Sequence, residues 1–207
     1  EDPAYIESDA TEYYGIRLDG SSNNTIENVT STNNTHGIHF KTTSANNTVS
    51  SSVFTANILS DIYVKNSGTN NFKNTSFSTA STTFEGDGLI NVYERARAYV
   101  TNISTSAVSG VGVTFTSADE SVTETVTTTA TGYTSYTDHL LAWTMSSSSV
   151  AVTNGGYNPF TVASAASSTY YATSTSSNLS SVNQTFSLVM LNAGITQSTT
   201  TLAVTEG

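Results

Sequence analysis

A short motif that returns every 22 to 24 residues constrains the first part of this chain more than any other feature. Gly15-Ile16-Arg17-Leu18 recurs as Gly37-Ile38-His39-Phe40 and again as Asp61-Ile62-Tyr63-Val64. A period in the low twenties is typical of a solenoid in which each repeat makes one turn. The repeats are short alternating runs separated by Asn, Ser and Thr, which favours strands over helices. We therefore expect a β-solenoid, and we call each of its turns a rung.

A second element keeps the same period and fixes the faces of the strands. Asn24-Thr25-Ile26 recurs as Asn47-Thr48-Val49 and then as Asn71-Phe72, with apolar residues 23 apart. Because side chains alternate along a strand, one set should point inward and stack between rungs: Ile16 and Leu18, Ile38 and Phe40, Ile62 and Val64. The intervening Arg17, His39 and Tyr63 should form an outward ladder. Asp19 aligns with Lys41 and Lys65, which predicts a surface ion pair between Asp19 and Lys41 worth at most about 1 kcal/mol.

These repeats resemble the NosD-type family of right-handed parallel β-helix proteins, common among secreted archaeal and bacterial proteins. The resemblance rests on Gly-Ile-x-Leu/Phe followed by Asn-Asn-Thr-Ile/Val and covers about residues 10–84. It implies a parallel β-helix of three rungs. It implies little about activity, because the family includes metal-handling proteins, polysaccharide-acting enzymes and passive surface proteins.

The pattern changes near residue 85, where longer alternating strands begin. Three apolar series alternate with polar residues: Ala96/Ala98/Val100, Val111/Val113/Phe115 and Phe186/Leu188/Met190. Turn signals fall at Ser109-Gly110, Ala118-Asp119-Glu120, Thr131-Gly132 and Asn154-Gly155-Gly156. About seven strands at this spacing predict an antiparallel sandwich. The chain is thus expected to be all-β, with a β-helix over 1–84 and a sandwich over 85–207.

The second part resembles the carboxypeptidase-regulatory-like, immunoglobulin-type modules of archaeal surface proteins. The matching segments are 111–115, 127–133 and 157–162, whereas Ala107-Val-Ser-Gly110 replaces the usual Gly-x-Pro-Val turn. Such modules are spacers or adhesive units, and the fold alone does not give the function.

Composition excludes several classes of partner. The chain has 6 Lys and Arg against 16 Asp and Glu, a net charge of −10, which disfavours nucleic acid. Ser and Thr make up about a third of the residues, yet 10% are aromatic, enough for a core rather than a disordered chain. The absence of Cys removes disulfides and thiolate chemistry. The sequence has no run of 18 apolar residues, so no membrane span is predicted.

Eight Asn-x-Ser/Thr sequences predict secretion and N-glycosylation. They lie mostly in expected turns, at Asn23, Asn28, Asn33, Asn46, Asn74, Asn102, Asn178 and Asn183. We expect an extracellular protein at the cell surface, with glycans on several sites that include Asn23, Asn33 and Asn46.

No catalytic, cofactor or metal site is expected. His36 and His39 form the one plausible metal pair, but three residues apart on a strand they should project to opposite faces. His139 should lie in a loop or at a strand edge, and Glu85-Gly-Asp87-Gly88 lacks the calcium-loop spacing and reads as a junction turn. The Arg17–His39–Tyr63 ladder could stack a sugar ring, although a solvated or packing face is favoured. A polysaccharide lyase would need clustered carboxylates, which the sequence does not show.

The sequence therefore predicts a non-enzymatic structural subunit of an extracellular glycosylated polymer: a filament, sheath or surface layer. Three rungs leave open ends, which other copies could cover by head-to-tail contact or strand addition. The tail from Ile195 to Val204 is the candidate added strand; pairing within its own sandwich is the alternative. Two other functions remain open: a monomeric carbohydrate- or cell-binding adhesin and, less favoured, a fragment of a polysaccharide-processing enzyme. A fragment of a longer β-helix would also explain the open ends.

Overall fold

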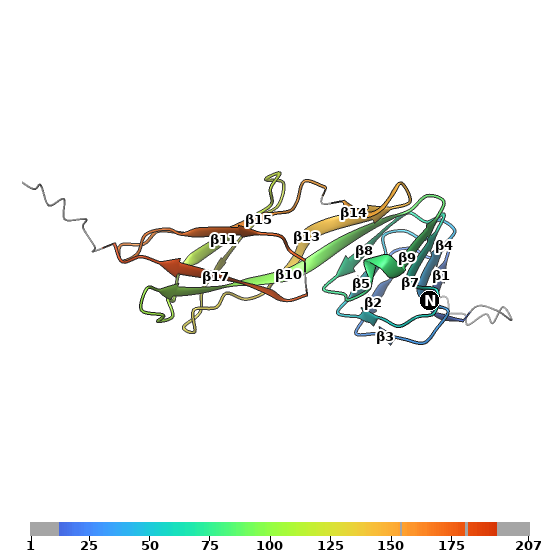
Figure 1. The fold of residues 1–207 in the computed structure, drawn as a ribbon, viewed down its shortest axis with the longest axis horizontal. Helices are drawn as coiled ribbons and strands as arrows, with labels where there is room; N and C mark the ends of the chain where they lie inside the picture. The colour runs from blue at the N-terminus through green and yellow to red at the C-terminus, as the bar shows by residue number, and fades with distance from the viewer. Residues whose placement is uncertain (1–12, 154, 181, 194–207) are drawn as a thin grey trace, which may run out of the picture.

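The protein is an elongated all-β molecule made of two units that share one long strand. The computed structural model describes residues 13–153, 155–180 and 182–193. Figure 1 shows a solenoid at one end of the long axis and two packed sheets at the other, with β10 (Leu89–Asn102) running from one to the other. The tail segment 195–204, where a strand is predicted, lies outside the described residues.

The solenoid consists of parallel sheets whose strands follow one another rung by rung. The first sheet contains β1 (Tyr14–Asp19), β4 (His36–Lys41), β7 (Ser60–Lys65) and β9 (Thr82–Glu85). The second contains β2 (Thr25–Glu27), β5 (Thr48–Ser50), β8 (Thr69–Lys73) and the first part of β10. A narrow third sheet pairs β3 (Thr30–Ser31) with β6 (Val53–Phe54), and a short 3-10 helix, η1 (Thr79–Ser81), precedes β9. The prediction of a parallel β-solenoid of about three rungs is confirmed.

The predicted register of the inward side chains is also confirmed. Ile16 pairs with Ile38, and Ile38 with Ile62. On the second sheet Ile26 pairs with Val49, and Val49 with Phe72. Each apolar side chain therefore lies directly over its equivalent in the next rung.

The repeated Asn-Asn-Thr sequence has a structural role at the corners of the rungs. Asn24, Asn47 and Asn70 form a ladder in which Asn47 and Asn70 are buried inside the coil and Asn24 is its exposed end. Asn47 Oδ1 lies 2.9 Å from both the backbone N and Nδ2 of Asn24, and Asn70 Oδ1 lies 2.9 Å from Asn47 Nδ2. These bonds satisfy backbone groups where the strands end.

The first Asn of the motif has a left-handed backbone, with φ of 62° at Asn23 and 56° at Asn46. Asn tolerates this conformation better than other residues with a side chain. The position therefore selects Asn for its backbone, independently of any glycan.

The strand β10 belongs to both units, so the solenoid extends past the boundary predicted at residue 85. Its first residues, Leu89–Tyr93, pair in parallel with β8 as the last rung of the solenoid. Its last residues, 96–102, pair in parallel with β17 (Gln184–Met190). On its other edge it pairs antiparallel with β13 (Thr137–Ser146), which in turn pairs with β14 (Ser149–Thr153).

The second unit packs this extended sheet against a separate antiparallel sheet. The second sheet contains, in spatial order, β12 (Thr123–Thr127), β11 (Gly112–Thr116), β15 (Phe160–Ser164) and β16 (Ser174–Ser177). Phe115 of β11 meets Phe186 of β17 edge to face, with ring centroids 6.1 Å apart. The three alternating apolar series predicted from the sequence are all buried.

One feature of the second unit differs from the prediction. The sandwich was expected to be antiparallel throughout, but β17 runs parallel to β10. The last strand thus runs in the same direction along the molecule as the strand by which the chain enters the unit. The predicted turns lie where expected, and Gly110, Gly132, Gly155 and Gly156 all have positive φ.

Candidate functional site

The outward face of the first sheet carries a ladder of aromatic and basic side chains. Arg17 pairs with His39 and His39 with Tyr63, as predicted. The structure adds a second column beside it, because Tyr14 pairs with His36. We call Tyr14, Arg17, His36, His39 and Tyr63 the outward ladder.

The prediction that His36 and His39 project to opposite faces is wrong. Their ring centroids lie 6.3 Å apart, and both rings lie between Tyr14 and Tyr63. The closest stack joins His39 to Tyr63, with centroids 4.4 Å apart and planes 18° apart. Nor is the ladder a fully solvated face, because His36 is 5% exposed and His39 2%.

The two histidines share a face because the alternation of the strand is interrupted at Gly37. A Cβ at Gly37 would lie 2.5 Å from the backbone O of Asp61 and 3.1 Å from Cδ1 of Phe54, on the inner side of the coil. Gly37 and Ile38 therefore both face inward, and the residues that flank them both face outward. Gly15 repeats the arrangement one rung earlier, since a Cβ there would meet Gly37 O at 2.6 Å.

Polar contacts hold the ladder at its far end. His36 Nδ1 lies 2.6 Å from Ser60 Oγ, and the Tyr63 hydroxyl donates to Glu85. Glu85 also pairs with Lys65 at 2.7 Å. The hydrogen bond from Lys65, and then that from Tyr63, lower the pKa of the Glu85 carboxyl below its usual value.

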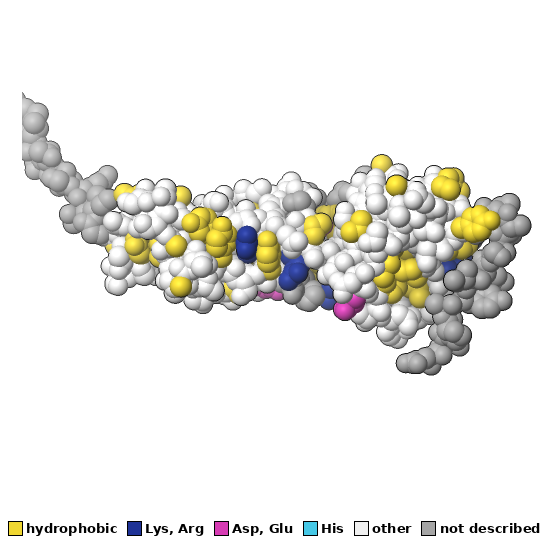
Figure 2. Space-filling model, turned by 90° about the horizontal axis from the view of Figure 1, so that it is seen from below, with side chains coloured by type: hydrophobic (Ala, Val, Ile, Leu, Met, Phe, Trp, Pro, Cys, Tyr) yellow, Lys and Arg dark blue, Asp and Glu magenta, His cyan; other side chains and the backbone are white. Residues whose placement is uncertain are grey.

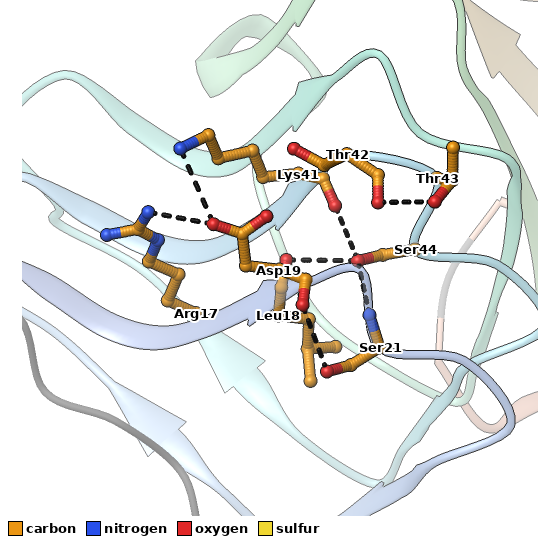
Figure 3. Close-up of polar contacts among 8 residues, drawn as sticks. All are labelled: Arg17, Leu18, Asp19, Ser21, Lys41, Thr42, Thr43 and Ser44. Atoms are coloured by element: carbon orange, nitrogen blue, oxygen red, sulfur yellow. Dashed lines mark hydrogen bonds and ion pairs between the residues drawn. The ribbon is translucent and has the colours of Figure 1, made fainter. Parts of the chain in front are cut away.

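The predicted ion pair between Asp19 and Lys41 is present beside the ladder (Figure 3). Asp19 Oδ2 lies 3.4 Å from Lys41 Nζ and 2.9 Å from an Nη of Arg17. Burial acts to raise the pKa of Asp19, but hydrogen bonds from Thr42 and Arg17 and the charge of Lys41 outweigh it and lower the pKa. Below the pair, the Ser44 hydroxyl lies 2.6 Å from the Lys41 carbonyl O, which ties the corner of the second rung.

The eight predicted glycosylation sites are all among the described residues. Six have positive φ: Asn23, Asn28, Asn33, Asn46, Asn74 and Asn183. Asn74 and Asn102 are half-buried and the other six are exposed. These positions are accessible to a glycan, while the αL backbone supplies a separate reason for Asn at most of them.

Other candidate sites do not assemble into a reaction centre. The Glu85–Gly88 segment is the turn between β9 and β10, with Gly86 at a φ of +75°. In the described part of the chain no three His, Asp or Glu residues gather as they would around a metal ion. The side chain of His139 lies outside the described set. No helix among the described residues is long and apolar enough to cross a membrane.

Comparison with known proteins gives one informative match. The family described as "Periplasmic copper-binding protein (NosD)" matches residues 5–127, more than half of the chain. A search of curated proteins found no match. Among solved structures, the Bacillus anthracis TIE protein aligns at 9% identity and a TM-score of 0.30, over 54% of this chain and 17% of that one. A likeness this slight informs neither fold nor function.

The name of the matched family suggests a copper site, but the His, Cys and Met residues that the structure describes do not fit one. Protein copper sites are built from His, Cys and Met. The chain has no Cys, and both methionines, Met145 and Met190, are fully buried in the apolar core. His36 and His39 are the only imidazoles whose side chains are described, and both are stacked on tyrosine rings.

The family match and the fold agree on the same segment. The matched residues contain the whole solenoid, whose rungs repeat in parallel sheets with aligned Gly-Ile motifs. The chain therefore belongs to the NosD family of β-helix proteins.

Proposed function

We propose that this protein is a structural subunit of an extracellular, glycosylated polymer, formed when the first described rung of one copy is covered by another copy. The single observation that carries the proposal is the difference in burial between the first rung and the rungs above it. Ile16, Leu18 and Ile26 are only half-buried. Their equivalents in the second rung, Ile38, Phe40 and Val49, are all 0% exposed.

The strand edges of the first rung support the same conclusion. Among residues 13–193, β1 pairs only with β4, and β2 pairs only with β5. Unpaired strand edges above an apolar surface are a template for another chain. At the other end β10 carries the second sheet of the solenoid into the second unit, while the first sheet ends at β9, where Phe84 is also half-buried.

Contact between the first rung of one copy and a different surface of the next copy would be head-to-tail. A joint between two different surfaces of the same protein repeats without closing and generates a filament or a layer. The tail 195–204 remains the candidate for an added strand. Its main chain would supply hydrogen bonds to the first rung, and alternate side chains would cover the half-buried apolar residues there. Its Leu202 and Val204 lie on one face of the predicted strand.

We propose further that the second unit is an immunoglobulin-type spacer of the carboxypeptidase-regulatory-like kind. Two facing sheets and a core drawn from alternate residues support this. As a spacer the unit would separate consecutive solenoids along the polymer. Six exposed Asn-x-Ser/Thr asparagines support a glycosylated, extracellular surface.

Negative-stain microscopy together with sedimentation tests the joint. Leu18→Lys should leave a folded monomer that no longer forms filaments or lattices, because a charge would have to be buried in the joint. Ile103→Lys is the matched control, since Ile103 is 49% exposed on the second unit. Assembly by Leu18→Lys equal to that of the native protein would contradict the proposal.

Deletion of residues 195–207 tests the donor strand separately. If the tail is the donor, the deleted protein stays folded and monomeric. If assembly persists unaltered, the tail is not the donor, and stacking of the first rung on another surface is the joint.

Intact-mass measurement tests the glycans. The mass of the native protein should fall on enzymatic deglycosylation. A native mass equal to that of the bare chain would rule out a glycoprotein.

A further inference from the structure

The outward face of β10 carries a row of tyrosines and basic side chains that the solenoid site does not use. Along β10 the even-numbered side chains from 90 to 100 are buried, and Tyr93, Arg95, Arg97 and Tyr99 alternate with them on the other face. Tyr133 and Tyr136, from the segment before β13, lie against this row. We call these six residues, with Lys73 of β8, the β10 row.

The side chains of the row are organised around Arg97. Its guanidinium carbon lies 4.2 Å from the ring centroid of Tyr133 and 4.8 Å from that of Tyr136. Its Nε donates to Thr185 Oγ1 at 3.1 Å, which fixes the plane of the group. Tyr99 stacks on Tyr133 with centroids 4.3 Å apart. Contacts of this kind hold a cation in place at an exposed surface.

The row concentrates basic residues on a protein that is acidic as a whole. It contains three of the six Lys and Arg residues in a chain of net charge −10. The other three, Arg17, Lys41 and Lys65, each pair with a carboxylate. Within the described residues, no carboxylate lies at ion-pair distance from Lys73 or Arg97. Figure 2 shows basic side chains beside hydrophobic ones along the middle of the molecule.

We propose that the β10 row binds a carboxylated polysaccharide, of the uronic-acid type. A guanidinium held flat by Thr185 presents terminal N–H groups that fit a carboxylate in a forked geometry. Tyrosine hydroxyls and ring edges beside it suit the polar edges of sugar rings. The neighbouring outward side chains on β17 are Thr185 and Ser187, which suit a hydroxyl-rich ligand better than an apolar peptide.

The net charge of the protein does not prevent such binding. Charges further away than about 8 Å are largely screened at physiological ionic strength. The electrostatic attraction of a bound carboxylate therefore depends on the cations of the row itself. The row lies on β10 and not on the first rung.

Calorimetric titration of the full-length protein with tetragalacturonate tests the proposal, with neutral galactotetraose as the matched ligand. We expect tetragalacturonate to bind and galactotetraose to bind at least about tenfold more weakly, because only the acid makes charge-assisted hydrogen bonds. Arg97→Gln should weaken binding of the acid by about tenfold, and Tyr133→Leu by severalfold. Lys65→Gln is the control, since Lys65 is paired with Glu85 away from the row.

Three results would overturn the proposal: no binding of tetragalacturonate, equal binding of the neutral ligand, or equal loss in Arg97→Gln and Lys65→Gln. Hexaglutamate binding as tightly as tetragalacturonate would also overturn it, because recognition would then be of charge and not of a saccharide. Thermal melting identifies variants that fail to fold. Should Arg97→Gln be one of them, Thr185→Val tests the same group by removing the hydrogen bond that orients it, and should weaken binding severalfold.

Discussion

The two units of this protein bury their cores in different ways. In the solenoid, equivalent residues lie over one another rung by rung, and polar ladders such as Asn24–Asn47–Asn70 run inside the coil. In the second unit no repeat exists, and the core forms between strands far apart in the chain, as between Phe115 and Phe186. A solenoid can therefore be extended by further rungs, whereas the second unit has no repeat to extend. Equivalent positions in the solenoid therefore differ in burial, since Ile16 is half-buried and Ile38 is fully buried.

The largest expected effect is at the middle rung. Ile38→Asp places a carboxylate where the native side chain is 0% exposed, which should cost at least about 5 kcal/mol and prevent folding of the solenoid. Ile16→Asp, one rung lower and half-buried, should cost about half as much in the dissociated protein. Urea unfolding of both variants measures the difference. Equal destabilisation would show that the first rung is closed.

The polar ladder provides the next test. Asn47→Ala removes an acceptor from Asn24 and a donor to Asn70 inside the coil, which should cost about 3–4 kcal/mol. Asn24→Ala, on the exposed end of the same ladder, should cost about 1 kcal/mol. Thermal unfolding of the two variants measures the difference. A larger loss of stability in Asn24→Ala than in Asn47→Ala would contradict the placement of Asn24 at the exposed end of the ladder.

The junction of the units contains a buried carboxyl that makes stability depend on pH. Glu94 of β10 is 5% exposed, and burial raises its pKa from 4.5 to about 7. The folded state therefore favours the protonated acid. Its contribution to stability is complete below about pH 4.5, is lost as the pH rises to about 7, and stays constant above that.

Glu94→Gln removes this dependence. The variant should match the native protein below about pH 4.5 and exceed its unfolding free energy by about 2–3 kcal/mol at pH 8. Urea titrations at pH 4, 6 and 8 measure the difference. A gap that does not change with pH would show that Glu94 does not titrate between the two states.

The smallest effect is expected at the surface ion pair. Asp19→Asn should cost less than about 1 kcal/mol, since the carboxyl is 43% exposed and partly screened by water. Because the pKa of Asp19 is lowered in the fold, its contribution is present above about pH 4 and is lost as the pH falls. Thermal melting at low and high salt checks the effect, which 1 M salt should abolish.

Much of the solenoid could be predicted from the sequence, because a repeat places equivalent residues in register. The inward stacks, the Arg17–His39–Tyr63 ladder and the Asp19–Lys41 pair follow from spacing alone. The shared face of His36 and His39 could not be predicted from alternation, because Gly37 interrupts it. The glycine before Ile16 and the one before Ile38 were visible as the signal that alternation fails there.

The second unit was less predictable, since its contacts join distant segments. Alternating apolar residues identified its buried faces, but periodicity carries no information on strand partners. The parallel pairing of β10 with β17 and the approach of Tyr133 and Tyr136 to Arg97 both depend on tertiary packing. For the same reason Glu94 could not be recognised as buried, because it occupies an inward position in a strand whose partners were unknown.

Hydrogen–deuterium exchange at increasing protein concentration tests the central claim, that the open first rung is the surface covered by another copy. At low concentration, amides in Tyr14–Ser31 should exchange much faster than those in His36–Phe54. As the protein assembles, the first segment should become protected to the level of the second, while β12 keeps its own rate. Protection of the first rung that is already complete in the dissociated protein, or that does not change on assembly, would contradict the account.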